Sequence, residues 1–239
     1  MDYENLLTVI KQRRTIRQYQ KEPVPIEEVM KVLEAARWAP SGRNTQPWEF
    51  VVVRDKDKLR IVAEILIQNI ERLGEASRFS PLSVKYLRDV TTFIIVCADS
   101  RFKAAYPQSN ATEELTRMYQ ENAERIFIES VSAAISNILL AATSLGLGTV
   151  WWTGTGESIT SNRLREVLKI PQELQTICCI PLGYPTDETP PQRSPRPLET
   201  MVHLDEFDVS KWRTDQEAER FIQDKHVRAE FFKTGRVTS

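Results

Sequence analysis

A short basic segment near the N-terminus is the first part of this sequence whose side chains could bind an anion. Arg13, Arg14, Thr15 and Arg17 bring three guanidinium groups and a hydroxyl together within five positions. If the chain is extended from Thr15 onward, Arg13, Thr15 and Arg17 share one side of it, because side chains alternate along extended backbone. Guanidinium groups bind phosphate through paired hydrogen bonds, and a hydroxyl adds a further donor. The spacing predicts a phosphate site, although a solvated basic turn would have the same composition.

The segment PSGRNTQPW, residues 40–48, combines a backbone-permissive glycine with two side-chain amides and an aromatic ring. Asn44 and Gln46 each offer a hydrogen-bond donor and an acceptor, which suits the imide edge of a flavin or a pyrimidine. A plain turn between a helix and a strand would look similar. Both interpretations stay open from this segment alone.

The glycine-rich segment GLGTVWWTGTG, residues 146–156, predicts a short strand that ends in a turn. Glycines in such a turn let backbone N–H groups approach a planar ligand closely. Trp151 and Trp152 are candidates for the wall of a ligand site, and equally for packing in the core.

Any bound anion must be held by local groups, because the overall charge is nearly balanced. Lys and Arg total 32 against 33 Asp and Glu, for a net charge of −1. This balance argues against nucleic acid or an anionic membrane as a partner. Further candidate phosphate contacts are Arg193 and Arg196, in a proline-rich segment that excludes regular structure.

Side chains that usually carry out acid–base, nucleophilic or metal chemistry are scarce. The two histidines, His203 and His226, have no nucleophile signature beside them, and the three cysteines lack the spacing of metal ligands. Cys178 and Cys179 are neighbours on a predicted strand and point to opposite faces, which favours packing over a redox pair. We therefore expect no metal site and expect a bound cofactor to carry the chemistry.

The bulk composition is that of a globular protein with a sizeable core, with 41% hydrophobic and 27% charged residues. No uninterrupted apolar run approaches the roughly 20 residues that cross a bilayer. The acidic N-terminus lacks the profile of a signal peptide. These features predict a cytoplasmic protein without membrane contact.

The elements that must position these segments follow from the spacing of apolar residues. Helices are expected over residues 2–12, 26–36, 56–70, 112–145 and 158–168, and strands over 48–53, 91–98, 149–152 and 174–182. From Val131 onward the long helix is apolar or small on nearly every face, so we expect it to be buried on all sides. A charged tail over residues 215–232 predicts a final helix. No repeat or composition shift marks a boundary, which favours one α+β domain.

Taken together and in this order, the segments resemble the FMN-dependent nitroreductase family. The basic RRTIR, the PSGRNTQPW turn, the long helix ending in GLG, and an IPLGYP strand followed by an arginine-bearing loop match over about residues 3–205. The resemblance implies an α+β fold with a mixed sheet flanked by helices, formed as an intertwined homodimer with two flavin sites at its interface. It divides the chain into an FMN-binding domain over residues 1–208 and a C-terminal extension over residues 209–239. That extension is expected to be helical and packed on the dimer, or to be an exposed amphipathic helix on its own subunit.

The resemblance also assigns site residues. The phosphate and ribityl end of FMN would be held by Arg13, Arg14, Thr15 and Arg17, with Arg17 also near the polar edge of the ring. From the partner subunit, the ring would be reached by Pro40, Ser41, Gly42 and Asn44. Thr153 and Gly154, the catalytic candidates, would lie beside flavin N5, where a backbone N–H stabilises charge on the reduced ring. Arg196, and less directly Arg193, would close the phosphate site.

The implied activity is a ping-pong hydride transfer from NADH or NADPH, through FMN, to small planar acceptors such as nitroaromatics or quinones. Substrate selection is expected from residues 65–120. The aromatic side chains there either line the pocket or merely pack in the core, and they are Phe79, Tyr86, Phe102, Tyr106 and Tyr119.

Two alternatives to this activity remain open. One is a reductive dehalogenase of the iodotyrosine deiodinase type, for which Lys85, Glu113 and Tyr119 are available; the other is a flavin-binding module without turnover. A polar substitution at Ile135 or Leu139 is expected to abolish the dimer and flavin binding together.

Overall fold

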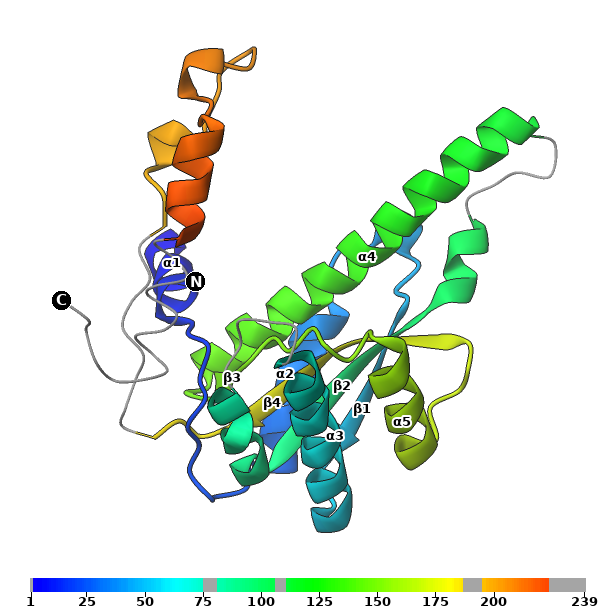
Figure 1. The fold of residues 1–239 in the computed structure, drawn as a ribbon, viewed down its shortest axis with the longest axis vertical. Coiled ribbons are helices and arrows are strands. Elements are labelled where there is room, and N and C mark those ends of the chain that lie inside the picture. Colours follow the sequence, from blue (N-terminus) through cyan, green and yellow to red (C-terminus); the bar gives the residue numbers. More distant parts are fainter. Residues whose placement is uncertain (1, 75–80, 106–110, 187–194, 224–239) are drawn as a thin grey trace. The chain divides into compact units, whose positions relative to one another are not determined.

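Four strands rich in β-branched and apolar residues form an antiparallel sheet (Figure 1). In the computed structural model the order is β1-β2-β4-β3, where β1 is Trp48–Val53, β2 Thr92–Asp99, β4 Leu174–Gly183 and β3 Gly148–Thr149. Every residue of β2 is buried, as expected for a central strand covered on both faces. A register shift between Val96 and Cys97 interrupts its pairing with β4.

The structure describes residues 2–74, 81–105, 111–186 and 195–223. The chain divides into two compact units, Met1–Pro190 and Pro191–Ser239, and each is treated by itself. The predicted limit of the FMN-binding domain at residue 208 stays a prediction. Phe79, Tyr106, Arg193 and the tail beyond residue 223 lie outside the described residues.

Five helices of the first unit agree with the sequence expectations to within a few residues. They are α1 Tyr3–Gln12, α2 Ile26–Arg37, α3 Lys56–Gly74, α4 Glu113–Ser144 and α5 Ser158–Leu168. Asp2 and Thr112 cap α1 and α4 by accepting hydrogen bonds from the first-turn N–H groups of Asn5 and Leu115. The 3₁₀ helices η2, Pro81–Asp89, and η3, Ser100–Ala105, follow α3 along the chain.

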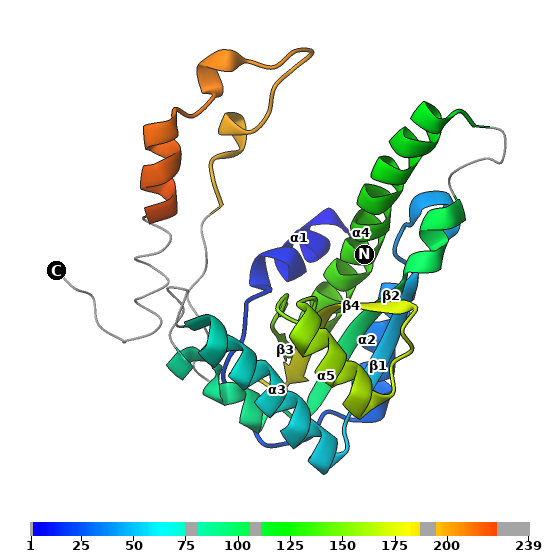
Figure 2. The same cartoon turned by 45° about the vertical axis from the view of Figure 1, so that its right-hand side comes forward.

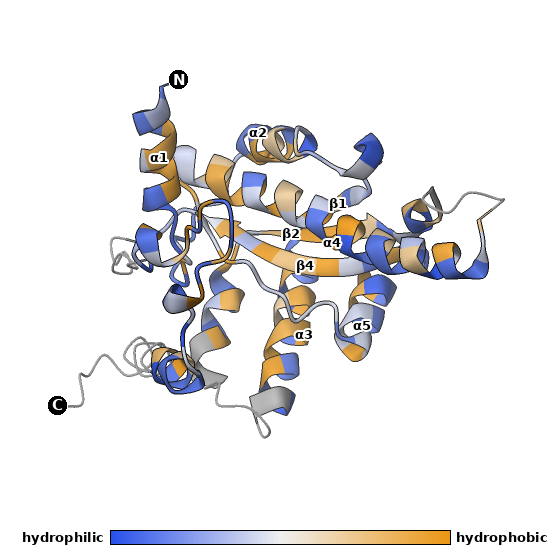
Figure 3. Ribbon diagram, turned by 90° about the horizontal axis from the view of Figure 1, so that it is seen from above, coloured by the Kyte–Doolittle hydropathy of each residue, from blue (hydrophilic) through white to orange (hydrophobic). Residues whose placement is uncertain are grey.

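The sheet separates two hydrophobic cores (Figure 3). Helices α2 and α4 cover the face to which Ile94, Val96 and Ala98 of β2 point. On the opposite face, Phe93, Ile95 and Cys97 pack against residues of α3, η2 and α5. Figure 2 shows α3 and α5 together on that side, in agreement with the contacts between them. The strict alternation along β2 follows from the two-residue period of a strand.

Helix α4 is not buried on all sides, and that sequence expectation is wrong for the single chain. Ile135 and Leu139 lie in the core, whereas Ser136 between them is exposed. One side of the helix packs on the sheet and α2, while part of the other side stays exposed. A polar side chain at Ile135 or Leu139 would therefore disrupt the fold of the subunit itself, not only a dimer interface.

By length and composition, α4 is also the one helix in the described part of the chain that could cross a membrane. In its most apolar stretch 44% of the residues are buried inside the protein, and the core helix of a soluble protein meets the same criterion. The contacts of α4 with α2 and β3 are those of a core helix.

The expected strand over residues 149–152 is shorter than predicted. Regular pairing ends at Thr149, and Trp152 then forms an isolated bridge with Cys179, in which each backbone N–H donates to the other carbonyl at 2.9 Å. Among the named strands all pairings are antiparallel. A parallel element enters this sheet as the isolated bridge between Thr15 and Thr149.

Two glycines allow the segment of residues 13–19 to lie against the edge of the sheet. A Cβ atom at Gly148 would stand 2.8 Å from Cβ of Ile16, and one at Gly183 would stand 2.8 Å from Cδ1 of Tyr19. Ile16 and Tyr19 are themselves buried by this contact. Larger residues at either glycine would push the segment away from the sheet.

The second unit is described from residue 195 to residue 223. It contains the short 3₁₀ helices η4 Leu198–Thr200 and η5 Val209–Lys211, and residues 215–223 are helical. His203 stacks on Phe207 with ring centroids 4.2 Å apart. No residue within this described stretch is buried, so the stretch has no core of its own.

We expect Gly183→Ala to destabilise the protein by about 1–3 kcal/mol, the usual cost of overpacking a closed site. The added methyl group must displace the Tyr19 ring, which lies in the core. The free energy of unfolding from denaturant titration measures the effect. Gly156→Ala is the matched control, because a Cβ there meets the Thr176 carbonyl oxygen at an ordinary 3.5 Å. Equal stabilities of the two variants would contradict the close approach.

Candidate functional site

The basic segment runs beside the strand that leads into the glycine-rich turn. The Ile16 N–H donates to the Thr149 carbonyl at 3.0 Å, and the Gln20 N–H donates to the Tyr184 carbonyl at 2.9 Å. The Tyr19 hydroxyl donates to the Ile16 carbonyl at 2.8 Å, which holds the segment in a compact bend. Residues far apart in the sequence are thereby joined, and Thr15 lies next to Thr149.

The arginines of this segment have different surroundings. The Arg14 guanidinium turns back onto the C-terminal end of α1, where it donates to the Lys11 carbonyl and, at 2.9 Å, to the Arg13 carbonyl. This places a positive charge where helix carbonyls favour it. Arg17 is exposed and forms no salt bridge in the described part of the chain. Arg14 thus has a structural task, while Arg17 has no carboxylate partner in the described part of the chain.

A buried side chain of α3 holds the glycine-rich turn in place through a hydrogen bond. Asn69, which is 1% exposed, donates to the Gly154 carbonyl at 3.3 Å, and its own side-chain oxygen accepts from Arg72 at 3.0 Å. The Thr176 hydroxyl donates to the Thr155 carbonyl at 2.8 Å. These bonds orient the peptide groups of residues 153–155, so the turn can present N–H groups to a ligand in a fixed direction.

The loop over residues 41–46 has strained backbone. Arg43, Asn44 and Gln46 have φ values of 53°, 56° and 47°, a region that non-glycine residues rarely occupy. The loop is fastened to α4 because the Gly42 N–H donates to the Ser130 hydroxyl oxygen at 3.1 Å. The Gln46 N–H donates to Ser41 Oγ at 3.0 Å. Backbone strain of this kind, kept by surrounding bonds, is typical of ligand-binding segments.

The structure brings together some of the predicted site residues and separates others. Arg13, Thr15 and Arg17 lie on the segment that pairs beside Thr149, a few residues before Thr153 and Gly154. The loop of Pro40, Ser41, Gly42 and Asn44 is anchored instead in the core on the opposite face of the sheet. No hydrogen bond within the described residues joins this loop to the other two segments.

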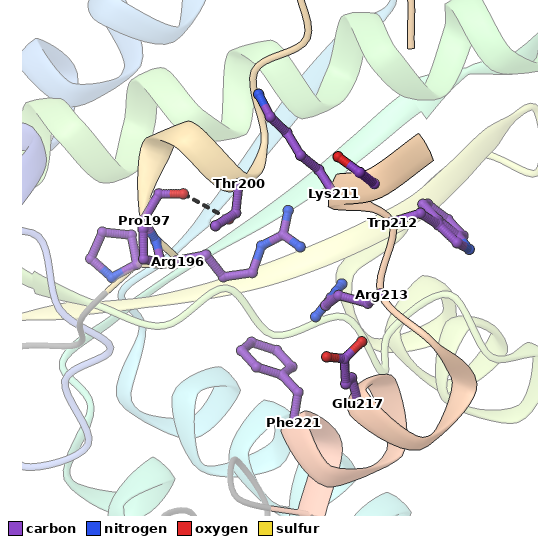
Figure 4. Close-up of a pocket in the computed structure, with 10 residues that line it drawn as sticks. Arg196, Pro197, Thr200, Lys211, Trp212, Arg213, Glu217 and Phe221 are labelled. Atoms are coloured by element: carbon purple, nitrogen blue, oxygen red, sulfur yellow. Dashed lines mark hydrogen bonds between the residues drawn. The ribbon is translucent and has the colours of Figure 1, made fainter. Parts of the chain in front are cut away.

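Arg196 belongs to the second unit and lines a cavity of about 440 Å³ there (Figure 4). The other lining residues include Lys211, Arg213, Glu217 and Phe221, with the Arg213 guanidinium carbon 5.0 Å from the Phe221 ring centroid. Among the charged residues that line the cavity, the three basic ones outnumber Glu217. The predicted role of Arg196 at the FMN phosphate, together with that of Arg193 outside the described residues, stays a prediction.

Several buried polar atoms around the basic segment and the turn have no partner. They include Arg14 Nε, Thr149 Oγ1, Trp152 Nε1 and Thr155 Oγ1. Buried polar groups are nearly always hydrogen-bonded, so each such atom needs an explanation. Their gathering near Arg17 and Gly154 fits a polar, phosphate-bearing ring cofactor such as FMN. The unpartnered N–H and O–H groups are hydrogen-bond donors, and the carbonyl and phosphate oxygens of FMN are acceptors.

Cysteine and metal chemistry are not supported by the described residues. All three cysteines are buried and free, and burial raises the pKa of the Cys97 thiol to about 12, which keeps it protonated. Across the described ranges no group of three or more His, Cys, Asp or Glu side chains could hold a metal ion.

Sequence reasoning missed Asn69 and Ser130. Helical spacing offered a signal for both, because Asn69 continues the buried row of Ile65 and Leu66, and Ser130 shares a helix face with the buried Phe127 and Ala134. A polar residue on an apolar helix face marks a buried hydrogen bond. The residues considered for a dehalogenase, Lys85, Glu113 and Tyr119, are all exposed. No hydrogen bond or ion pair in the described ranges brings them together.

Comparison with known proteins identifies the family. The Nitroreductase family profile matches residues 10–184. An Archaeoglobus fulgidus protein provisionally named an NADH dehydrogenase/NAD(P)H nitroreductase is 34% identical over 185 residues, covering 77% of this chain and 88% of that protein. An iodotyrosine deiodinase from Thermotoga neapolitana is 32% identical over 189 residues, covering 77% and 91%. The chain belongs to the nitroreductase family.

A solved structure agrees with this assignment. A Desulfovibrio desulfuricans protein, provisionally called a nitroreductase and solved in complex with FMN, superimposes with a TM-score of 0.61 at 29% identity. The match covers 85% of this chain and 98% of that one. The predicted α+β nitroreductase fold is thereby confirmed.

We expect Asn69→Leu to lower the free energy of unfolding by about 1–3 kcal/mol, because the Gly154 carbonyl and Arg72 lose their buried partner. Denaturant titration measures this loss. Gln68→Leu is the control, since the neighbouring Gln68 is exposed and its bond to Arg163 lies at the surface. If both variants were as stable as the parent, Asn69 would not hold the turn.

Proposed function

We propose that this protein is an FMN-dependent oxidoreductase that uses NADH or NADPH to reduce small planar acceptors such as nitroaromatics or quinones. The observation that carries the proposal is the pairing of the basic segment with the strand that leads into the glycine-rich turn. A cationic segment and a rigid row of peptide groups stand side by side. The phosphate end and the ring of one cofactor need those two features together.

Each part of the site has a task in this proposal. Arg13, Thr15 and Arg17 bind the phosphate and ribityl end, and Arg14 supports them while it caps α1. Thr153 and Gly154 direct backbone N–H groups at the N5 side of the ring. Asn69 fixes the orientation of that peptide, which matters because a preorganised donor stabilises charge without having to rearrange.

FMN held here by Arg13, Thr15 and Arg17 would supply two-electron transfer from NADH or NADPH to the acceptor that takes the nicotinamide's place. The chain itself supplies no acid–base side chain at the turn, and this fits a cofactor that carries the chemistry. Its contributions are position, a wall for stacking and a positive environment for the reduced ring. An open site of this kind selects acceptors mainly by planarity.

The active form in this proposal is a homodimer. Helix α1 has no buried residue, and its Leu6 and Ile10 are each 45% exposed. One side of α4 is uncovered as well, and the second unit has no core of its own. A second copy would cover these surfaces and bring its strained loop, with Pro40, Ser41, Gly42 and Asn44, to the ring.

Three free cysteines fit a reducing compartment, and we infer a cytoplasmic location.

A reductive dehalogenase is the second candidate. Its support comes from relatives named iodotyrosine deiodinase, of which the Thermotoga neapolitana protein is 32% identical. Such an enzyme would use the same flavin site and select a halogenated tyrosine through charged groups near residues 85–119. Release of iodide from 3-iodotyrosine by the reduced protein, at a rate above that of nitroaromatic reduction, would favour it.

The deciding experiment is an absorbance spectrum of the purified protein, before and after anaerobic addition of NADH or NADPH. We expect flavin bands that bleach with at least one of the two nicotinamides and return when a quinone is added. Bands that do not bleach would favour the dehalogenase or a flavin-binding module without turnover. Absence of flavin even after reconstitution with FMN would refute the proposal.

The double variant Arg13→Ala/Arg17→Ala tests the phosphate site. Each charge-assisted bond contributes about 1.5–3 kcal/mol, so FMN affinity should fall by a factor on the order of 100 or more. Fluorescence titration of the apoprotein with FMN measures it, and riboflavin, which lacks the phosphate, should lose less affinity than FMN. Arg60→Ala is the control, an exposed arginine paired only with Asp57 on α3. Undiminished FMN affinity in the double variant would remove these residues from the site.

A further inference from the structure

A histidine side chain closes the loop of residues 203–208 in the second unit. The Asp208 N–H donates to Nδ1 of His203 at 3.0 Å. The His203 ring also stacks on Phe207, with ring centroids 4.2 Å apart. A ring nitrogen accepts a hydrogen bond only while it carries no proton. The closed loop therefore requires a neutral ring with Nδ1 unprotonated.

Asp208 joins this loop to η5 and to the cavity of the second unit. Its carboxylate caps η5 by accepting hydrogen bonds from the Ser210 N–H at 3.0 Å and from the Ser210 hydroxyl at 2.6 Å. The Lys211 ammonium group donates to the Val202 carbonyl at 2.9 Å, which ties η5 to the residue before the loop. Ser210 and Lys211 both line the cavity shown in Figure 4. The loop and this wall of the cavity thus share one set of hydrogen bonds.

The carboxylate of Asp208 offers the protonated ring a different partner. The charged side chains of the loop and of η5 are Asp205, Glu206, Asp208 and Lys211. The charge of Asp208 interacts with His203, and hydrogen bonds from Ser210 hold the pKa of Asp208 below its usual value, so this carboxylate stays ionised near neutral pH. Both nitrogens of a protonated imidazole are donors. Such a ring cannot accept from the Asp208 N–H and is attracted to the carboxylate, where it competes with Ser210.

We propose that His203 is a pH-dependent latch of the second unit. Its neutral ring closes the loop and leaves the Asp208 carboxylate free to cap η5. Its protonated ring releases the Asp208 N–H, competes for the carboxylate and loosens this wall of the cavity. Histidine is the side chain whose charge ordinarily changes between about pH 5 and pH 8. The loop is therefore closed at the upper end of this range and opens as the pH falls, with or without bound FMN.

The test follows backbone amide signals of the full chain by nuclear magnetic resonance from about pH 8 to about pH 5. In the wild type, the signals of Asp208 and Ser210 should move with one common midpoint as the hydrogen bonds are lost. Protection of the Asp208 N–H against hydrogen exchange, relative to an unfolded chain at the same pH, should fall about fivefold, the factor that one net hydrogen bond supplies. The Thr214 N–H is the internal control, because it donates to Glu217 Oε2 at 2.8 Å and involves no histidine.

Three variants separate the latch from a general effect of acid. His203→Asn keeps an acceptor oxygen near the place of Nδ1 and takes up no proton, so the Asp208 signal should stay at its high-pH position throughout. His203→Phe keeps a ring to stack on Phe207 but has no acceptor, so the signal should stand at its low-pH position throughout. His226→Asn removes the other histidine of the chain and should leave the wild-type transition unchanged. A transition that persists in His203→Asn, or an Asp208 signal that does not move in the wild type, would overturn the latch.

Discussion

The contact of the segment 13–19 with the edge of the sheet is the constraint on which the candidate site depends. Ile16 and Tyr19 are buried only because Gly148 and Gly183 leave room for them. The buried side chains fix the register of the segment. That register sets which residues face outward, and it brings Arg17 beside Tyr86 and Thr15 beside Thr149. Packing on the inner side of the segment thus determines the electrostatics of its outer side.

Much of this arrangement could be predicted from the sequence. Apolar spacing located the helices and the three long strands, and the cap residues Asp2 and Thr112 stand where α1 and α4 begin. The basic segment, the amide-containing loop and the glycine-rich turn were recognised because each has an unusual composition. Signals of this kind are local, so a single sequence contains them. The order of the segments then sufficed to identify the family.

What could not be predicted depends on contacts between distant residues. Asn69 has the appearance of a core position until Gly154 is seen to accept its hydrogen bond. Arg14 was grouped with the phosphate-binding arginines, and its bonds to the end of α1 emerge only from the fold. The apolar composition of α4 predicted complete burial, because composition does not distinguish a side that the same chain covers from one that it leaves exposed.

The division into two cores has a genetic consequence for the proposed dimer. The basic segment and the turn belong to the core on one face of the sheet, whereas the strained loop is anchored in the core on the other face. Each complete site would then combine one face of one copy with the opposite face of its partner. Two defective alleles, one damaged on each face, would complement each other. A mixed dimer would collect both lesions in one site and leave the second site intact.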